Sequence, residues 1–357
     1  MKRDIGIDLI RGVAMITIAI NHAYFFAVSG GYQGPRIPTP TVFGLSSAAE
    51  LFVGLSGYMV GMVYARREQY GPKLAQRAGK LYILNAVMLA ALSLFVLVVP
   101  ANLVSATRLE PYMNDPGSAV INFLTLQHAP NLLDVLQLYI IFMITAIPAT
   151  WLLRKSLLIF ITSTALIYCI AQIALFSGHD IGANPFWLPA WQFLFFGSMA
   201  AGFKTLHVPI FAWIDKNTRL IVVPFALLAL TYAYIKLGPV LGYQHYAPKK
   251  GELSIVRILH AVTLVAFYAF MIALTRRWHQ TKPLQSVALI GRQTLNGFLA
   301  SIVFTYYGVL FIAQPIGGIP GYLLMTTMVL ASVYVCAAWS ERRKNQEKAL
   351  NPGYRKG

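Results

Sequence analysis

Charged residues are scarce in this sequence. Asp, Glu, Lys and Arg make up 11% of the 357 residues, whereas soluble domains carry about 25%. Hydrophobic residues make up 57%, and the mean hydropathy is +0.61. So few charges exclude a soluble globular protein, and so many apolar residues exclude a disordered chain. The composition indicates an integral membrane protein with many spans.

Cysteines and acidic residues are also few. The two cysteines, Cys169 and Cys336, lie in apolar stretches and predict no disulfide framework. Only 12 acidic residues stand against 29 basic ones, which leaves a net charge of +17. In a soluble protein this charge would suggest a nucleic-acid partner, but membrane proteins gather basic residues on their cytoplasmic loops. We therefore expect no nucleic-acid partner and expect these loops to contact anionic lipid.

Several motifs that mark other functions are absent. The sequence has no Gly-rich phosphate loop, no zinc-ligand spacing and no Gly-x-Ser-x-Gly elbow. It also has no helix with regularly spaced arginines, which excludes a voltage sensor. We expect neither a metal nor a prosthetic group.

Ten segments are apolar and long enough to cross a bilayer, which takes about 20 residues. They lie at 7–28, 47–65, 81–100, 132–153, 156–176, 187–203, 220–236, 255–275, 287–313 and 319–339. The ninth opens with a polar run, so we expect its true start nearer residue 294. The prediction is an all-α membrane protein, a bundle of about ten transmembrane helices. One membrane domain would cover 1–340, and a basic cytoplasmic tail would follow at 341–357.

Basic residues set the orientation of the spans. With a cytoplasmic N-terminus, the inside segments hold twenty-one Lys and Arg residues. The outside segments hold four, namely Arg36, Arg108, Lys249 and Lys250. Because cytoplasmic loops carry the excess of basic residues, both termini are predicted to be cytoplasmic. The apolar surface of such a bundle is large enough to support a homodimer.

The first span carries two ionisable residues, Arg11 and His22. At 100° per residue they lie about 20° apart around a helix and roughly 16 Å apart along it. Ionisable groups inside a span are costly and are candidates for function. The alternative is structural: Arg11 reaches the cytoplasmic surface, and His22 hydrogen-bonds a neighbouring helix.

The second span begins near Glu50, at the same broad level as His22. A carboxylate beside an imidazole fixes its tautomer and raises its basicity, although Glu50 also suits a helix N-terminus for electrostatic reasons alone. Gly54, Gly57 and Gly61 make a small-residue face for close helix packing. Further along the chain, five polar residues are expected to line an outward-facing cup suited to a sugar: His128, Asp134, Tyr139, Asn184 and Gln192. Trp187 is expected to anchor the sixth span at the membrane surface.

Five blocks in the order of the chain, from about residue 3 to 310, resemble the OpgC-type membrane proteins. Those are related to the type-three acyltransferase superfamily, whose first span carries an arginine, ten residues and then a histidine. Gln137 departs from the family pattern, where proline is usual. The blocks are Asp8-Leu9-Ile10-Arg11-Gly12 with Asn21-His22, the segment 48–58, Asp134-Val135-Leu136-Gln137-Leu138-Tyr139, Asn184-Pro185 with Trp191-Gln192 and Gly197, and Gly291-Arg292-Gln293-Thr294-Leu295.

The resemblance implies an O-acyltransferase of the bacterial inner membrane that moves an acyl group, succinyl or acetyl, from cytoplasmic acyl-CoA to a periplasmic glycan. For OpgC itself the implied reaction is succinylation of osmoregulated periplasmic glucans. By matching position, Arg11 would contact the donor, and His22 would be the general base or a transient acyl carrier. Glu50 would orient His22. The acceptor would be bound by Asp134, Tyr139, Asn184 and Gln192. The basic residues Arg66 and Arg67 would attract the donor, or they would reflect only the excess of basic residues on cytoplasmic loops.

Two other functions fit a basic bundle with buried ionisable groups. In a proton-coupled transporter or flippase of a small molecule or glycolipid, Arg11, His22 and Glu50 would form a relay. A membrane scaffold whose catalytic site has decayed is the other alternative.

Overall fold

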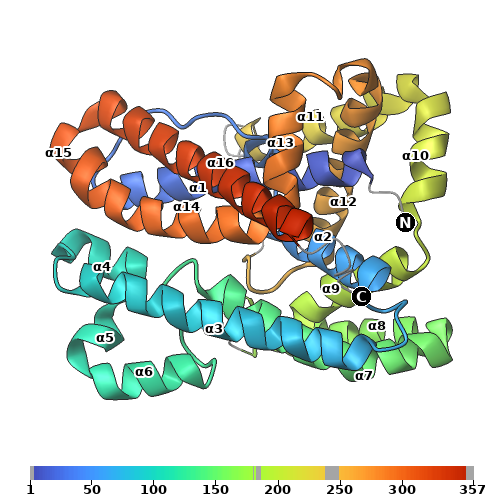
Figure 1. Ribbon diagram of the computed structural model, residues 1–357, viewed down its shortest axis with the longest axis horizontal. Coiled ribbons are helices and arrows are strands. Elements are labelled where there is room, and N and C mark those ends of the chain that lie inside the picture. Colours follow the sequence, from blue (N-terminus) through green and yellow to red (C-terminus); the bar gives the residue numbers. More distant parts are fainter. Residues whose placement is uncertain (1–3, 180, 182–185, 238–248, 351–357) are drawn as a thin grey trace. The chain divides into compact units, whose positions relative to one another are not determined.

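The computed structural model describes residues 4–179, 181, 186–237 and 249–350. These residues form helices joined by loops and turns, and they contain no strand. This confirms the predicted all-α fold (Figure 1). Within them, eight segments are helical, long and apolar enough to cross a membrane. They are α1 (Ile5–Ser29), α3 (Tyr70–Val96), α7 (Asp134–Lys155), α8 (Leu157–Phe176), Thr218–Ile235 in η2 (Thr218–Ile221) and α11 (Val222–Leu237), α12 (Ile255–Leu274), Thr294–Ile316 from α14 (Thr294–Gly308) onward, and α16 (Gly318–Leu350).

The other two predicted spans contain shorter helices. α2 (Ala48–Val63) and α9 (Leu188–Phe203) have 16 residues each. α9 bends by 79° into α10 (His207–Lys216), and the pair counts as a ninth span or as a re-entrant segment. The bend falls at Thr205, whose φ of +52° lies in the left-handed region and ends the helix. The described helices thus give eight or nine spans where the sequence predicts ten.

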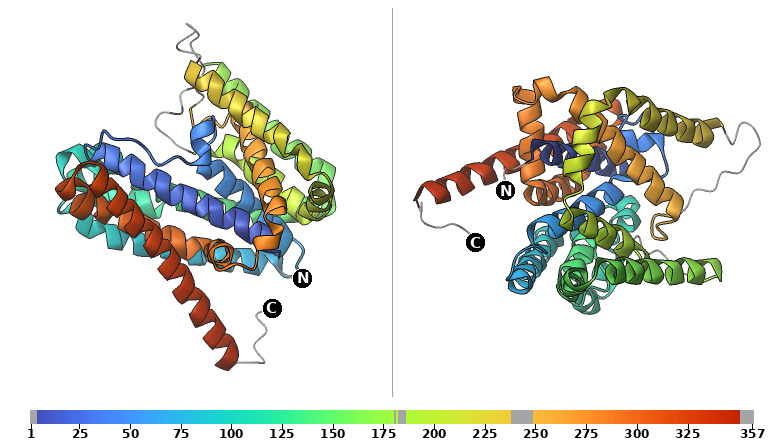
Figure 2. Two further views of the ribbon diagram at one scale, coloured as in Figure 1. Left: turned by 90° about the horizontal axis from the view of Figure 1, so that it is seen from above. Right: turned by 90° about the vertical axis from the view of Figure 1, so that its right-hand side faces the viewer.

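Short helices join the spans. η1 (Pro40–Phe43) precedes α2, and the long predicted outer loop holds α4 (Ala101–Thr107), α5 (Glu110–Asn114) and α6 (Pro116–Leu124). η3 (Arg276–Trp278) and α13 (Lys282–Arg292) precede α14, whose start at Thr294 confirms the predicted position. η4 (Val309–Ala313) and α15 (Gln314–Ile316) follow it. α16 remains helical to Leu350, well into the predicted tail (Figure 2).

The chain forms two compact units, which are described separately. Unit 1 comprises Met1–Thr39, Ala91–Ala106 and Leu274–Gly357. Within it, α1 packs against α13, α14 and α16. Gly12 of α1 faces the backbone carbonyl of Val287, and Gly291 of α13 faces that of Asp8. These glycines let α1 and α13 approach backbone to backbone.

Unit 2 comprises Pro40–Ala90 and Thr107–Ala273. Its closest helix pair is α2 and α9, with α7 and α8 packed against α9. Gly57 and Gly61 of α2 face the backbone carbonyls of Phe195 and Met199 on α9. The predicted small-residue face of the second span is therefore confirmed as a helix-packing surface.

We expect Gly57→Ala to destabilise the protein because the added methyl group would overlap the Phe195 carbonyl. Overpacking of this kind costs about 1–3 kcal/mol and should lower the thermal unfolding midpoint in detergent. Gly197→Ala is the matched control, since Gly197 lies on the same helix pair and its side-chain position is open. Equal midpoints for the two variants would contradict the packing role of Gly57.

Candidate functional site

Arg11 and His22 lie on one unbroken helix, α1. Asp4 begins this helix by accepting a hydrogen bond from the Gly6 N–H, 2.7 Å from N to Oδ1. Because the helix continues to Ser29, Arg11 and His22 keep the shared face that their spacing predicts.

Arg11 is held by Thr294, which belongs to the block from Gly291 to Leu295. Its Nη2 donates to Oγ1 of Thr294, at 2.6 Å and across 283 residues of sequence. Thr294 is the first residue of α14. One turn further along α14, the ring of Phe298 meets the imidazole of His22 edge-on, with 6.2 Å between centroids. One face of α14 thus contacts both candidate residues of α1.

Unit 2 contains a cavity of about 750 Å³. Asp134, at the first turn of α7, lines it beside Arg108, whose Nη1 lies 3.6 Å from Oδ2 of Asp134. His128 and Trp187 also line the cavity. Two members of the predicted cup, Asp134 and His128, therefore share one cavity, and Trp187 adds an aromatic wall to it.

Two other members of the predicted cup, Tyr139 and Gln192, lie elsewhere. Tyr139 packs edge-on against Phe52, with ring centroids 5.5 Å apart. Gln192 donates from Nε2 to the Thr164 carbonyl at 2.8 Å, which ties α9 to α8. Neither residue lines this cavity. Asn184 lies outside the described residues.

Ionisable side chains at and near the cavity are partly buried. The Nζ of Lys250 lies 4.1 Å from the centroid of the Phe186 ring, which lines the cavity. Burial lowers the pKa of Lys250, and the nearby carboxylate of Asp134 opposes that shift. Burial also lowers the pKa of His128, and the positive charge of Arg108 lowers it further. Nδ1 of His128 is buried without a hydrogen-bond partner among the described residues.

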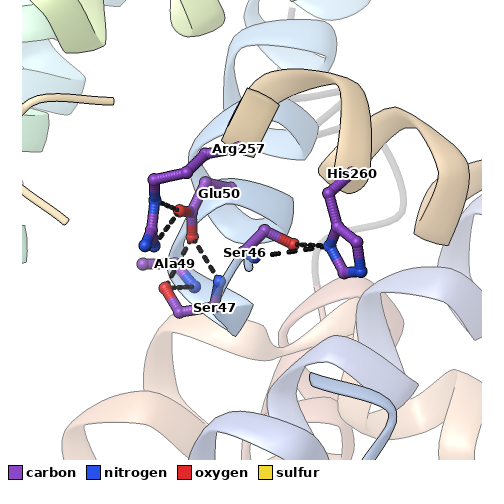
Figure 3. Close-up of polar contacts among 6 residues, drawn as sticks. All are labelled: Ser46, Ser47, Ala49, Glu50, Arg257 and His260. Carbon is purple, nitrogen blue, oxygen red and sulfur yellow. Dashed lines mark hydrogen bonds and ion pairs between the residues drawn. The ribbon is translucent and has the colours of Figure 1, made fainter. Parts of the chain in front are cut away.

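Glu50 lies in a polar cluster with α12 (Figure 3). It is only 1% exposed, and its Oε2 accepts from the Ser47 N–H at 2.8 Å, which closes a capping box at the start of α2. Its Oε1 accepts from Nε of Arg257 at 2.8 Å. One turn along α12, Nδ1 of His260 accepts from the Ser46 N–H at 3.3 Å.

This cluster fixes the start of α2. Arg257 and His260 are ionisable residues inside an apolar span, so the rule that selects Arg11 and His22 also points to them. Both carboxylate oxygens of Glu50 are engaged within unit 2. The proposed role of Glu50 in orienting His22, which belongs to unit 1, stays a prediction.

Arg66 and Arg67 contact the ends of helices. Arg66 donates from Nε to the carbonyl of Phe203, the last residue of α9, at 2.8 Å. Arg67 donates from Nε to the carbonyl of Val63, the last residue of α2, at 3.0 Å. Both satisfy carbonyls that a helix C-terminus leaves without partners. Donor binding by these two residues stays a prediction.

A family model described as "OpgC protein" matches residues 3–345 of the sequence. The chain belongs to the OpgC family. The match covers all five blocks that resemble OpgC-type proteins, including the Arg11 and Thr294 motifs that meet in unit 1. No curated protein and no solved structure matches the chain. Membership of the wider type-three acyltransferase superfamily stays a prediction.

We expect Glu50→Gln to destabilise the protein strongly, because Arg257 would keep a buried charge without its carboxylate. Breaking a buried pair from one side costs about 3–5 kcal/mol, so the thermal midpoint should fall sharply. Glu347→Gln is the control, since it breaks an exposed pair with Arg343 on α16 and should leave the midpoint unchanged. Adding Arg257→Gln to Glu50→Gln should restore part of the loss. A midpoint unaffected by Glu50→Gln would contradict the structural role of this pair.

The lowered pKa of His128 predicts a pH effect on stability. As the pH falls below about 6.5, the ordinary imidazole value, the unfolded chain binds a proton before the folded one does. Stability is therefore lost on acidification through this window. We expect the thermal midpoint to fall less between pH 7 and pH 5 in His128→Asn than in the wild type. The same pH dependence in both proteins would contradict the burial of a neutral imidazole.

Proposed function

We propose that this protein is an O-acyltransferase that moves an acyl group from cytoplasmic acyl-CoA to a hydroxyl of a periplasmic glycan, such as an osmoregulated periplasmic glucan. It would act as a multi-pass protein of the bacterial inner membrane. The observation that carries the proposal is the family match over residues 3–345. The meeting of Arg11 with Thr294 supports it, because two distant blocks of the family pattern form one contact.

Arg11 is proposed to bind the acyl-CoA donor. Its guanidinium donates to Thr294, and a guanidinium carries five N–H donors, which suits recognition of a phosphate or of the amides of the pantetheine chain. The roughly 16 Å between Arg11 and His22 along α1 is a length that an extended pantetheine arm can cover. The thioester would then reach His22 while the nucleotide stays at the cytoplasmic side.

His22 is proposed to act as the general base. The imidazole takes the proton of the glycan hydroxyl, and the hydroxyl oxygen attacks the thioester carbonyl. The new ester C–O bond forms as the C–S bond breaks, and the departing thiolate takes up the proton. In the other mechanism His22 first accepts the acyl group and then passes it to the hydroxyl.

The cavity of unit 2 is proposed to bind the glycan. Its volume of about 750 Å³ falls in the range of about 300–1,000 Å³ typical of ligand pockets. Asp134 and His128 offer hydrogen-bonding groups for hydroxyls, and Trp187 offers an aromatic face for a sugar ring. Tyr139, Asn184 and Gln192 are proposed to assist by their match to the family pattern alone.

The proposal is tested with wild type, His22→Ala and His22→Asn in nanodiscs. A panel of acyl-CoAs is offered with a glucan acceptor, and both free thiol and acylated glucan are measured. We expect wild type to use one donor preferentially and both variants to lose at least about 100-fold in transfer. Unchanged thermal midpoints show that the variants are folded.

The outcomes separate the mechanism from the function. Wild-type transfer rates in folded His22→Ala would refute the role of His22. Neither binding nor release of any acyl-CoA by folded wild type would refute the acyltransferase and favour a transporter or flippase. The bend between α9 and α10 is the feature of this chain that resembles the broken helices of transporters.

A further inference from the structure

We propose that Glu341 is a positioning residue for the donor site of the proposed acyltransferase. Its carboxylate fixes the turn between α13 and α14, and Thr294 at the end of this turn binds the guanidinium of Arg11. The inference rests on the proposed role of Arg11 in binding acyl-CoA and adds a residue of the last span to that site.

The carboxylate of Glu341 binds two consecutive residues. Its Oε1 accepts from Nε of Arg292 at 3.1 Å, and its Oε2 accepts from Nε2 of Gln293 at 2.6 Å. Arg292 ends α13, Thr294 begins α14, and Gln293 alone lies between the two helices. Both carboxylate oxygens are therefore engaged where the chain turns from one helix into the next.

A second contact with α16 holds the same turn from its other side. Nδ2 of Asn296, in the first turn of α14, donates to Oγ of Ser340 at 2.9 Å. The Ser340 hydroxyl donates in turn to the Cys336 carbonyl at 2.7 Å, which orients it. Two consecutive residues of α16 thus bind side chains on both sides of Thr294.

The turn also lies against α1. Gly291, next to Arg292, faces the backbone carbonyl of Asp8, and Oγ1 of Thr294 accepts from Nη2 of Arg11 at 2.6 Å. Thr294 is only 4% exposed, so little water competes for its hydroxyl. A hydrogen bond weakens steeply with misalignment. The position of the turn therefore decides whether Arg11 keeps this partner.

The exposure of the Arg292–Glu341 pair favours a geometric role over a large contribution to stability. Its side chains are 22% and 21% exposed. The pair of Arg257 and Glu50 is far more buried, with side chains 8% and 0% exposed. An ion pair that water partly screens contributes little to the free energy of unfolding. Its hydrogen bonds still restrict the turn, because one carboxylate holds two neighbouring side chains.

Positioning and simple electrostatics predict opposite effects of removing this carboxylate. The CoA donor is a polyanion, so the loss of a negative charge would by itself strengthen donor binding. The loss of a contact that holds the turn would instead loosen the bond between Thr294 and Arg11 and weaken donor binding. The direction of the change in donor affinity separates the two effects.

The experiment measures kcat and KM for acetyl-CoA and succinyl-CoA with a glucan acceptor, and the Kd of free CoA, using full-length protein in nanodiscs. We expect Glu341→Gln to raise KM and Kd about 10-fold, at the lower end of the range for a hydrogen bond to a charged group. The kcat should stay near the wild-type value, since binding rather than chemistry is affected. Glu341→Asp, which keeps the carboxylate, should recover part of the affinity.

A double variant tests the route from Glu341 to the donor. Arg11→Gln should raise KM and Kd by itself, and adding Glu341→Gln should raise them no further, because Glu341 acts through Arg11. Glu347→Gln is the matched control, since it removes the same charge from an exposed ion pair on the same helix. It should leave KM and Kd at the wild-type values. Thermal midpoints establish that each variant is folded.

Each outcome decides the proposal. A donor KM that folded Glu341→Gln leaves unchanged or lowers overturns it. A rise of the same size in the Arg11→Gln background also overturns it, because Glu341 would then act by another route. A wild type that neither binds CoA nor transfers an acyl group overturns the proposed function and this inference with it. A failure of Glu341 alone differs from that result, because wild-type transfer and its loss in Arg11→Gln would remain.

Discussion

The ion pair between Glu50 and Arg257 shows the constraint under which this structure is built. A membrane offers no water to a buried charge, so a charged side chain must find its partners within the protein. Glu50 is 1% exposed and serves both the Ser47 N–H and Arg257. One carboxylate thereby joins the start of α2 to the start of α12 across 207 residues of sequence. Desolvation offsets much of the attraction in such a pair. The main effect of the pair is therefore to fix which helix ends meet.

Backbone contact supplies the attraction that the hydrophobic effect cannot provide between helices in lipid. α2 and α9 touch through Gly57 and Gly61, and α1 and α13 touch through Gly12 and Gly291. Packing without intervening side chains brings dispersion forces between backbones into play. In unit 1 this contact also fixes the start of α1, where Arg11 donates a hydrogen bond to Thr294 of α14.

Sequence alone could predict the helices but not most of their partners. The bilayer requires long apolar runs, so the spans and the start of α14 near residue 294 are readable. The bend at Thr205 cannot be predicted from the sequence, because neither a glycine nor a proline occupies the position with the left-handed backbone. Helical periodicity gives the face of a residue but not the helix opposite that face. Gln192 was therefore expected in a polar cup, whereas its amide binds the Thr164 carbonyl. Asp134 lines the cavity because it begins α7, at the end of a span, where side chains meet water.

The described arginines have two kinds of partner, carboxylates and neutral oxygens. Arg108, Arg257 and Arg292 pair with carboxylates, whereas Arg66 and Arg67 donate to backbone carbonyls at helix ends. The guanidinium of Arg36 lies over the Tyr24 ring, and the residues on either side of Arg36 hydrogen-bond to Tyr32 and Tyr322. The loop thus holds a half-buried cation against the side chains of Asn21 and Thr39. Partial burial of a guanidinium costs folding free energy, and the hydrogen bonds to Asn21 and Thr39 and the contact with the Tyr24 ring offset part of that cost.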